Sequence, residues 1–231
     1  MAKPCLQHAH KFLPRRAALG ATLVTALAGS GLIMAAPAQA ATTGTPANPI
    51  AEAQHHAERA KADAYKIDVS AAQVLALAKA QVGTSENSRG GGTKFQRWYA
   101  QSQRALETIR RDGGSRAGYL NAAWCAMFVS WVGEHAGARP QVGWDAYTVT
   151  HAKWFKDNDR WGSAPKPGAV VFFSWRGGKS VSAVQHVGFV VKDNKNGTIS
   201  TIEGNTGNGS VEQRVRPKWQ VVGYGYPEYA A

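Results

Sequence analysis

Cysteine is scarce in this chain of 231 residues, which contains only Cys5 and Cys125. A scaffold stapled by several disulfides is therefore excluded, and the fold must be held together by an apolar core. The sequence also lacks a set of metal ligands at the usual spacing and a glycine-rich phosphate loop. We therefore expect no cofactor.

Long apolar runs are equally scarce, since the single one extends from Ala17 to Ala36. Basic residues without any acid precede it, and the small-x-small sequence Ala38-Gln39-Ala40 follows it at once. This order predicts a secretory signal peptide over residues 1–40. The Arg15-Arg16 pair suggests the twin-arginine export route. A membrane anchor is the alternative, but glycines interrupt the run, so we expect no stable membrane insertion after cleavage.

Acidic residues are few, with 15 Asp and Glu against 27 Lys and Arg. The signal peptide removes four basic residues and no acid, so the formal net charge falls from +12 to +8. A basic exported protein can attract nucleic acid, anionic lipid or an anionic wall polymer. The basic residues are scattered and no nucleic-acid motif is present. We expect a secreted or cell-wall-associated monomer whose partner is the anionic cell wall.

Cleavage after residue 40 would also remove Cys5 and leave Cys125 as the one cysteine, with no internal disulfide. A lone cysteine in an exported domain has three common explanations. It can be a buried packing residue, it can form an intermolecular bridge, or it can be a catalytic nucleophile.

The rest of the chain divides into a linker with a marginal helix at 41–69 and one folded domain at 70–231. Capping boxes formed by Ser70 with Gln73 and by Thr93 with Gln96 predict the first two helices of this domain. Further helices are predicted near residues 124–134 and 148–157.

After Pro167-Gly168 the apolar pattern changes from the helical period to alternation along strands. This change predicts an α+β fold with N-terminal helices packed on an antiparallel sheet. The expected strands are 169–175, 186–192, 198–203, 211–215 and 220–226.

Cys125 stands at the start of the third predicted helix, in the sequence Ala123-Trp124-Cys125-Ala126-Met127. The unpaired amides and the dipole at a helix N-terminus favour a thiolate, which makes such a cysteine a stronger nucleophile. Apolar residues follow it and would bury the helix. From its position alone, Cys125 can be either a catalytic nucleophile or a buried core residue.

A thiol nucleophile needs an imidazole that exchanges protons with it. His55 and His56 lie in the linker, and His135 is about 15 Å further along the same helix. His151 begins a polar helix and is expected to be exposed. His186 begins the apolar strand His-Val-Gly-Phe-Val-Val, where a polar ring fits only beside a site. His186 is therefore the candidate base by elimination.

The base in turn needs a group that orients it. The turn at Asn196-Gly197 predicts a two-residue or a four-residue hairpin loop. In both registers His186, Glu203 and Asn205 lie on one face, unless a three-residue loop or a bulge intervenes. Glu203 is then the orienting carboxylate and Asn205 a second polar partner. Alternatively, these residues are merely a polar strand end.

Several motifs together resemble the CHAP domain family of cysteine- and histidine-dependent amidohydrolases and peptidases, which have a papain-like core. They are Trp124 to Trp131, Pro167-Gly168, His186-Val187-Gly188 and Glu203-Gly204-Asn205. The resemblance covers roughly residues 72–227. It departs at Ala169, where the family often has aspartate.

The resemblance implies a site of four residues: Cys125 as nucleophile, His186 as base, Glu203 as orienter and Asn205 as a fourth member. It also implies acyl transfer on amide bonds of peptidoglycan, as in wall amidases and endopeptidases. It does not choose the amide bond that is cut. The alternatives are a general secreted cysteine protease or acyl transferase, and a catalytically idle wall-binding module.

Two features of such a site are open at this point. The Cys125 backbone N–H would donate to the oxyanion, with Tyr119 or Asn121 as the nearest upstream candidates for a second donor. Trp124, Trp144 and Trp175 are candidates for a glycan groove, although most tryptophans are simply packed in a core.

Overall fold

The computed structural model describes residues 65–231. The predicted signal peptide (1–40) and nearly all of the predicted linker (41–69), with His55 and His56, lie outside the described residues. Within 65–231, no helix is both long enough and apolar enough to cross a membrane.

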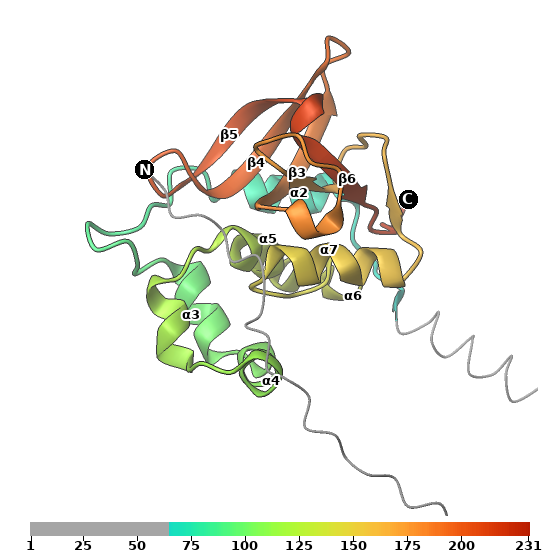
Figure 1. Ribbon diagram of the computed structural model, residues 1–231. Helices are drawn as coiled ribbons and strands as arrows, with labels where there is room; N and C mark the ends of the chain where they lie inside the picture. The colour runs from blue at the N-terminus through green and yellow to red at the C-terminus, as the bar shows by residue number, and fades with distance from the viewer. Residues whose placement is uncertain (1–64) are drawn as a thin grey trace, which may run out of the picture. The chain divides into compact units, whose positions relative to one another are not determined.

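Helices come first and strands follow, as an α+β fold requires (Figure 1). The helices are α2 (Ala71–Lys79), α3 (Lys94–Gln101), α4 (Gln103–Asp112), α5 (Cys125–His135), α6 (Arg139–Val142) and α7 (Thr148–Asp157), with 3-10 turns η1 (Arg116–Asn121), η2 (Val181–Ala183) and η3 (Lys218–Gln220). The strands are β1 (Trp161–Gly162), β2 (Val170–Phe173), β3 (His186–Asp193), β4 (Thr198–Thr206), β5 (Ser210–Pro217) and β6 (Val221–Gly225).

The N-terminal ends of the first helices are fixed by side-chain caps. Ser70 Oγ accepts from the Gln73 backbone N–H at 3.3 Å, and the Gln73 side chain accepts from the Ser70 N–H at 2.9 Å. Thr93 and Gln96 form the same capping box on α3, so both predicted boxes are present. Ser102 caps α4, a helix that the sequence analysis did not predict.

The strands form one six-stranded sheet in the order β1-β6-β2-β3-β4-β5, with antiparallel neighbours throughout. This arrangement agrees with the papain-like, CHAP-type fold that the resemblance implied. The two-residue strand β1 was not predicted. Its pairing with β6 extends the sheet at one edge.

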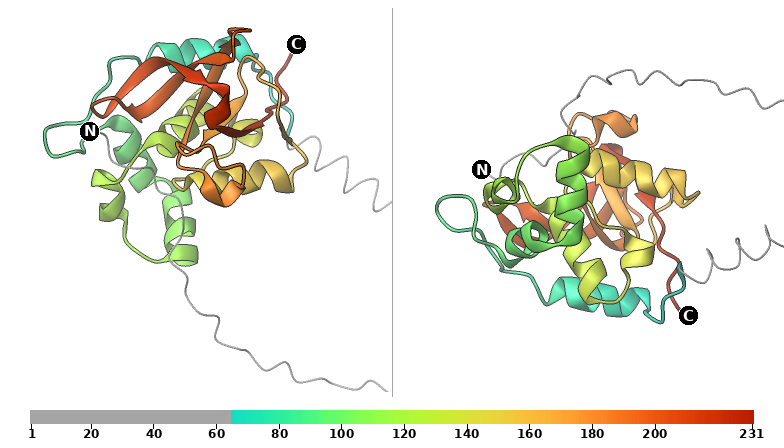
Figure 2. Two further views of the ribbon diagram at one scale, coloured as in Figure 1. Left: turned by 45° about the horizontal axis from the view of Figure 1, so that its top comes forward. Right: turned by 90° about the horizontal axis from the view of Figure 1, so that it is seen from below.

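Helix α5 is the central helix, because it packs against β3 and β4 and also against α2, α3, α6 and α7. Every residue from Cys125 to Gly133 is buried. In Figure 1 α5 and α7 lie beneath the sheet and α3 and α4 lie further below, and in the view from below in Figure 2 the helices stand in front of the strands. A second apolar cluster around Phe173, Val190 and Ile199 packs separately from the main core.

A bulge decides which residues of β3 and β4 face each other. Near the turn Asp193 pairs with Ile199, a register that neither predicted loop gives, but the register shifts between Val190 and Lys192. Beyond the bulge Phe189 pairs with Ile202, as a four-residue loop would place them. The predicted turn was therefore wrong, and the bulge restores the predicted register where the candidate site lies.

Candidate active site

Cys125 is the first residue of α5, and the N-cap residue Trp124 does not cap this end through its side chain. The N-cap residue Trp124 makes no side-chain capping bond, whereas Ser70, Thr93 and Ser102 each cap their helices. The Trp124 ring instead stacks on Phe95 at 5.2 Å between ring centroids. The first-turn amides of α5 therefore receive no side-chain acceptor from the N-cap, as an oxyanion-binding helix end requires.

The Cys125 side chain is fully buried, and its sulfur is disulfide-bonded in the full-length chain. The other cysteine of the sequence, Cys5, lies outside the described residues and within the predicted signal peptide. The expectation that Cys125 has no disulfide concerns the chain that begins at residue 41.

The start of α5 packs directly on β4. A Cβ atom added at Gly204 would lie 2.6 Å from Cβ of Phe128 and 2.8 Å from the Trp124 ring. Real Cβ atoms do not approach so closely, so only glycine allows this contact. The contact brings the residue before Cys125 against the β4 segment that carries Glu203 and Asn205.

His186 and Glu203 form a buried pair. His186 Nε2 lies 2.9 Å from Glu203 Oε2, and the side chains are 4% and 0% exposed. Gly188 makes room for the acid, because a Cβ there would lie 2.7 Å from Glu203 Cγ. The structure thus brings together the predicted base and the predicted orienting carboxylate.

Glu203 is held by more than the histidine. Arg216 on β5 contacts both carboxylate oxygens, with Nε 2.9 Å from Oε1 and Nη2 2.6 Å from Oε2. Thr201 Oγ1 donates to Oε1 at 2.6 Å. Burial raises the pKa of Glu203, but the hydrogen bonds and positive charges of His186 and Arg216 outweigh it and lower the pKa to about 2. The sequence analysis missed Arg216 and Thr201.

Asn205 follows this segment in the left-handed backbone region, at φ 54°, and is 3% exposed. Asparagine tolerates this conformation better than most residues. The β4–β5 register is irregular between Glu203 and Thr206. The strand alternation from which the face of Asn205 was predicted therefore does not extend to it.

Trp175 is the one of the three candidate tryptophans that borders this pair. Its ring centroid lies 5.2 Å from that of His186, and its side chain is 36% exposed. Trp124 is fully buried, and Trp144 is half-buried under the guanidinium of Arg139 at 4.4 Å. Trp175 is thus the tryptophan placed to meet a substrate.

One other expectation was wrong. His151 is 1% exposed rather than exposed, because its ring packs against Phe155 and Phe172 in the core. Its helix face packs inward, which its polar neighbours in sequence concealed. Tyr119 is buried with its ring 5.0 Å from that of Tyr99, and the second oxyanion donor stays a prediction.

Comparison with known proteins agrees with the resemblance seen in the motifs. The family model described as CHAP domain matches residues 116–205. No curated protein and no solved structure matches the sequence. A CHAP domain indicates a cysteine- and histidine-dependent amidohydrolase or peptidase. All four predicted site residues, Cys125, His186, Glu203 and Asn205, lie inside the segment that this family model matches.

Proposed function

We propose that this protein is an exported cysteine hydrolase that cuts amide bonds of bacterial peptidoglycan by thiol acyl transfer. The observation that supports it most is the buried His186–Glu203 pair, on the strand segment against which the Cys125 helix begins. In this proposal Cys125 is the nucleophile, His186 the acid and base, and Glu203 the orienting carboxylate.

The first step forms a thioester and releases an amine. The Cys125 thiolate attacks the amide carbonyl carbon, and the amides at the uncapped start of α5 donate to the oxyanion. Because Nε2 of His186 is bound to Glu203, the other ring nitrogen, Nδ1, gives its proton to the departing nitrogen. The carbon–nitrogen bond breaks and the carbon–sulfur bond remains.

The second step releases the acid and restores the enzyme. His186 Nδ1 takes a proton from water, and the resulting hydroxide attacks the thioester carbonyl. The carbon–sulfur bond then breaks, the substrate leaves as a carboxylic acid, and the Cys125 thiolate faces an imidazolium again. The ionised Glu203 holds the same ring tautomer through both steps.

The proposal that peptidoglycan is the substrate rests on the net charge of the protein and on its expected export. The chain that begins at residue 41 has a formal net charge of +8, from 23 basic and 15 acidic residues. Bacterial walls are polyanionic, so binding through this charge would weaken as salt rises. An exported hydrolase of this family meets the wall before it meets any other polymer.

The test is digestion of purified peptidoglycan by residues 41–231 and by the Cys125→Ala variant, with released fragments identified by mass. Only the unchanged protein is expected to release peptides, and the new termini name the bond. Casein serves as the competing substrate, and its cleavage without wall cleavage would favour the general protease. Release by neither protein from walls of several chemistries would contradict the hydrolase and favour a binding module.

A second measurement examines the nucleophile without any substrate. Iodoacetamide is expected to alkylate Cys125 of residues 41–231 rapidly at neutral pH, because the helix end and His186 favour a thiolate. The His186→Ala variant should react more slowly. Equal rates in the two proteins would argue against a thiolate–imidazolium pair.

A further inference from the structure

Arg216 is a partly buried cation that the mechanism above does not use. It lies on β5, and its side chain is 15% exposed. Its Nε and Nη2 both contact the Glu203 carboxylate, and this two-point contact fixes the plane of the acid as well as its position. Because Glu203 is the proposed orienting carboxylate, Arg216 is a candidate member of the same site.

The guanidinium is itself held in place. Nη2 of Arg216 also donates to Thr206 Oγ1 at 3.0 Å. Its Cζ lies 4.9 Å from the centroid of the Trp175 ring, the same ring that borders His186. Arg216 is therefore clamped between Trp175 and β4, and a lysine could supply the charge there but not the planar contact.

One oxygen atom contacts both side chains. Glu203 Oε2 lies 2.9 Å from Nε2 of His186 and 2.6 Å from Nη2 of Arg216. The position of Arg216 therefore sets where Oε2 lies, and Oε2 in turn sets the direction of the imidazole. The Trp175 ring packs on both the imidazole and the guanidinium.

The shared carboxylate also has an electrostatic consequence. The charged or titratable groups that act on Glu203 are His186 from β3 and Arg216 from β5. Their hydrogen bonds and charges keep the buried carboxyl ionised, so it accepts hydrogen bonds from both side chains.

We propose that Arg216 is a positioning residue, which fixes the Glu203 carboxylate and through it the direction of the His186 imidazole. The proposal rests on the proposed function, because it assigns a task to the same Cys-His-Glu site. It adds a third strand, β5, to the elements that build this site.

The experiment compares Arg216→Met, Arg216→Lys and the matched control Arg214→Met in residues 41–231. Arg214 lies two residues earlier on the same strand and pairs with Glu212, away from the histidine. For each variant, kcat and KM for wall cleavage are measured against pH. The pH dependence of Cys125 alkylation by iodoacetamide is measured in parallel.

Arg216→Met is expected to lower kcat by about tenfold or more with KM nearly unchanged, because the acid and the imidazole lose their fixed geometry. The rate of Cys125 alkylation at neutral pH should fall as well, because the imidazole no longer has a fixed direction toward the thiol. Arg216→Lys should also lower kcat, because an ammonium group cannot make the two-point contact. Arg214→Met should behave as the unchanged protein.

Arg216→Met with an unchanged kcat and an unchanged alkylation rate would overturn the proposal. If circular dichroism shows that Arg216→Met does not fold, Arg216→Lys decides, and an unchanged kcat there overturns it equally. Failure of the proposed function looks different. The unchanged protein would then release no wall fragments, while the alkylation rate would still show whether Arg216→Met disturbs the pair of Cys125 and His186.

Discussion

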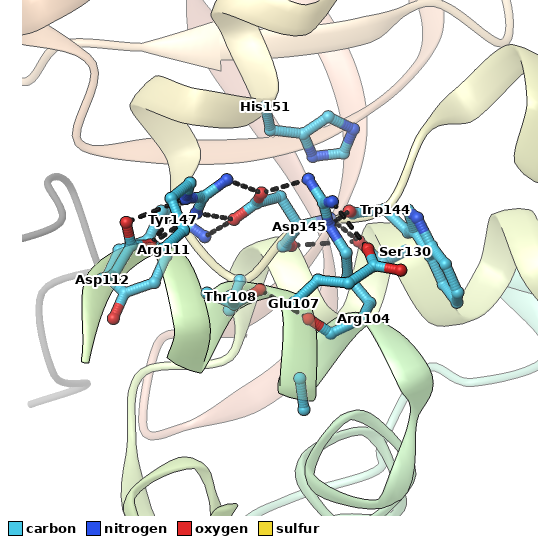
Figure 3. Close-up of polar contacts among 12 residues, drawn as sticks. Arg104, Glu107, Thr108, Arg111, Asp112, Ser130, Trp144, Asp145, Tyr147 and His151 are labelled. Atoms are coloured by element: carbon cyan, nitrogen blue, oxygen red, sulfur yellow. Dashed lines mark hydrogen bonds and ion pairs between the residues drawn. The ribbon is translucent and has the colours of Figure 1, made fainter. Parts of the chain in front are cut away.

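Two buried carboxylates in this domain are bound by arginines, yet the two have different roles. Glu203 is bound by Arg216 and also accepts a hydrogen bond from His186. Asp145, in the loop between α6 and α7, is bound by Arg104 at 2.9 Å and by Arg111 at 3.1 Å, both from α4 (Figure 3). An arginine on a buried acid is thus common to both regions and identifies neither as a site.

The difference lies in what the remaining contacts do. Asp145 Oδ1 accepts from the Tyr147 backbone N–H at 2.9 Å, and the Asp145 backbone exchanges two hydrogen bonds with Ser130 of α5. These contacts tie α4 to the central helix. His151 lies beside the cluster in Figure 3, but its Nε2 contacts the Val142 carbonyl rather than the acid. We therefore interpret the Asp145 cluster as structural.

The largest effect is expected at Asp145. Asp145→Ala leaves two partly buried arginines without their shared acid and leaves the Tyr147 N–H without an acceptor. The free energy of unfolding should fall by about 4 kcal/mol, and Tm by about 10 °C. Thermal and urea unfolding of residues 41–231 measure both. Wall cleavage well below Tm should keep the kcat of the unchanged protein.

Asp145→Asn is the matched control, because an amide oxygen can still accept from Tyr147 while the charge is lost. It should recover part of the lost stability. A large loss of kcat in either variant, measured on protein shown to be folded, would contradict the structural interpretation and make the two carboxylates alike.

The second-largest effect is expected at Glu203, where a substitution should change the catalytic activity. Glu203→Gln keeps the shape of the side chain but removes the charge that orients His186 and stabilises its imidazolium. We expect kcat to fall by about 100-fold, equivalent to about 2.7 kcal/mol. This loss of kcat is measured by digesting peptidoglycan for fixed times under conditions in which both proteins are fully folded. Activity within twofold of the unchanged protein would remove Glu203 from the site.

The same variant gives a stability test with a definite sign. The pKa of Glu203 is lowered from 4.5 to about 2, so the folded state binds this proton less readily than the unfolded state. The corresponding stability is present above pH 4.5 and is lost as the pH falls toward 2. The difference in unfolding free energy between the unchanged protein and Glu203→Gln should shrink across this window. A constant difference would contradict the lowered pKa.

Much of this fold follows from local signals in the sequence. The capping boxes at Ser70 and Thr93 locate α2 and α3, and alternation locates the strands of the sheet. The helix that begins at Cys125 was predicted near residues 124–134, although no capping box precedes it. The register beside the site was predicted for an incomplete reason, because the bulge near Val190 depends on packing that strand alternation does not contain.

The residues that the sequence analysis missed or misplaced were missed for a different reason. Arg216 reaches Glu203 from a third strand, and its partner is set by the register between β4 and β5, in which Glu203 pairs with Glu212 and Ile199 with Arg216. That register depends on the turn before Ser210 and could not be taken from alternation alone. His151 was misplaced because its polar neighbours concealed that it shares a helix face with Phe155.

The smallest effect is expected at His151, the counterpart of His186 beside the other carboxylate. Burial lowers the pKa of His151, although the Val142 carbonyl and Asp145 oppose the shift. The unfolded state therefore takes up this proton first as the pH falls below about 6.5. The resulting stability is present above that pH and is lost below it, with a slope of at most about 1.4 kcal/mol per pH unit. His151→Gln, which keeps a donor for Val142, should lack this extra slope. Urea unfolding of both proteins at pH 7.5, 6.5 and 5.5 gives the two slopes, with about 0.5 kcal/mol as a detectable difference. Equal slopes would mean that His151 is charged in the folded protein, and the histidine beside Asp145 would then resemble His186 more closely than its carbonyl partner indicates.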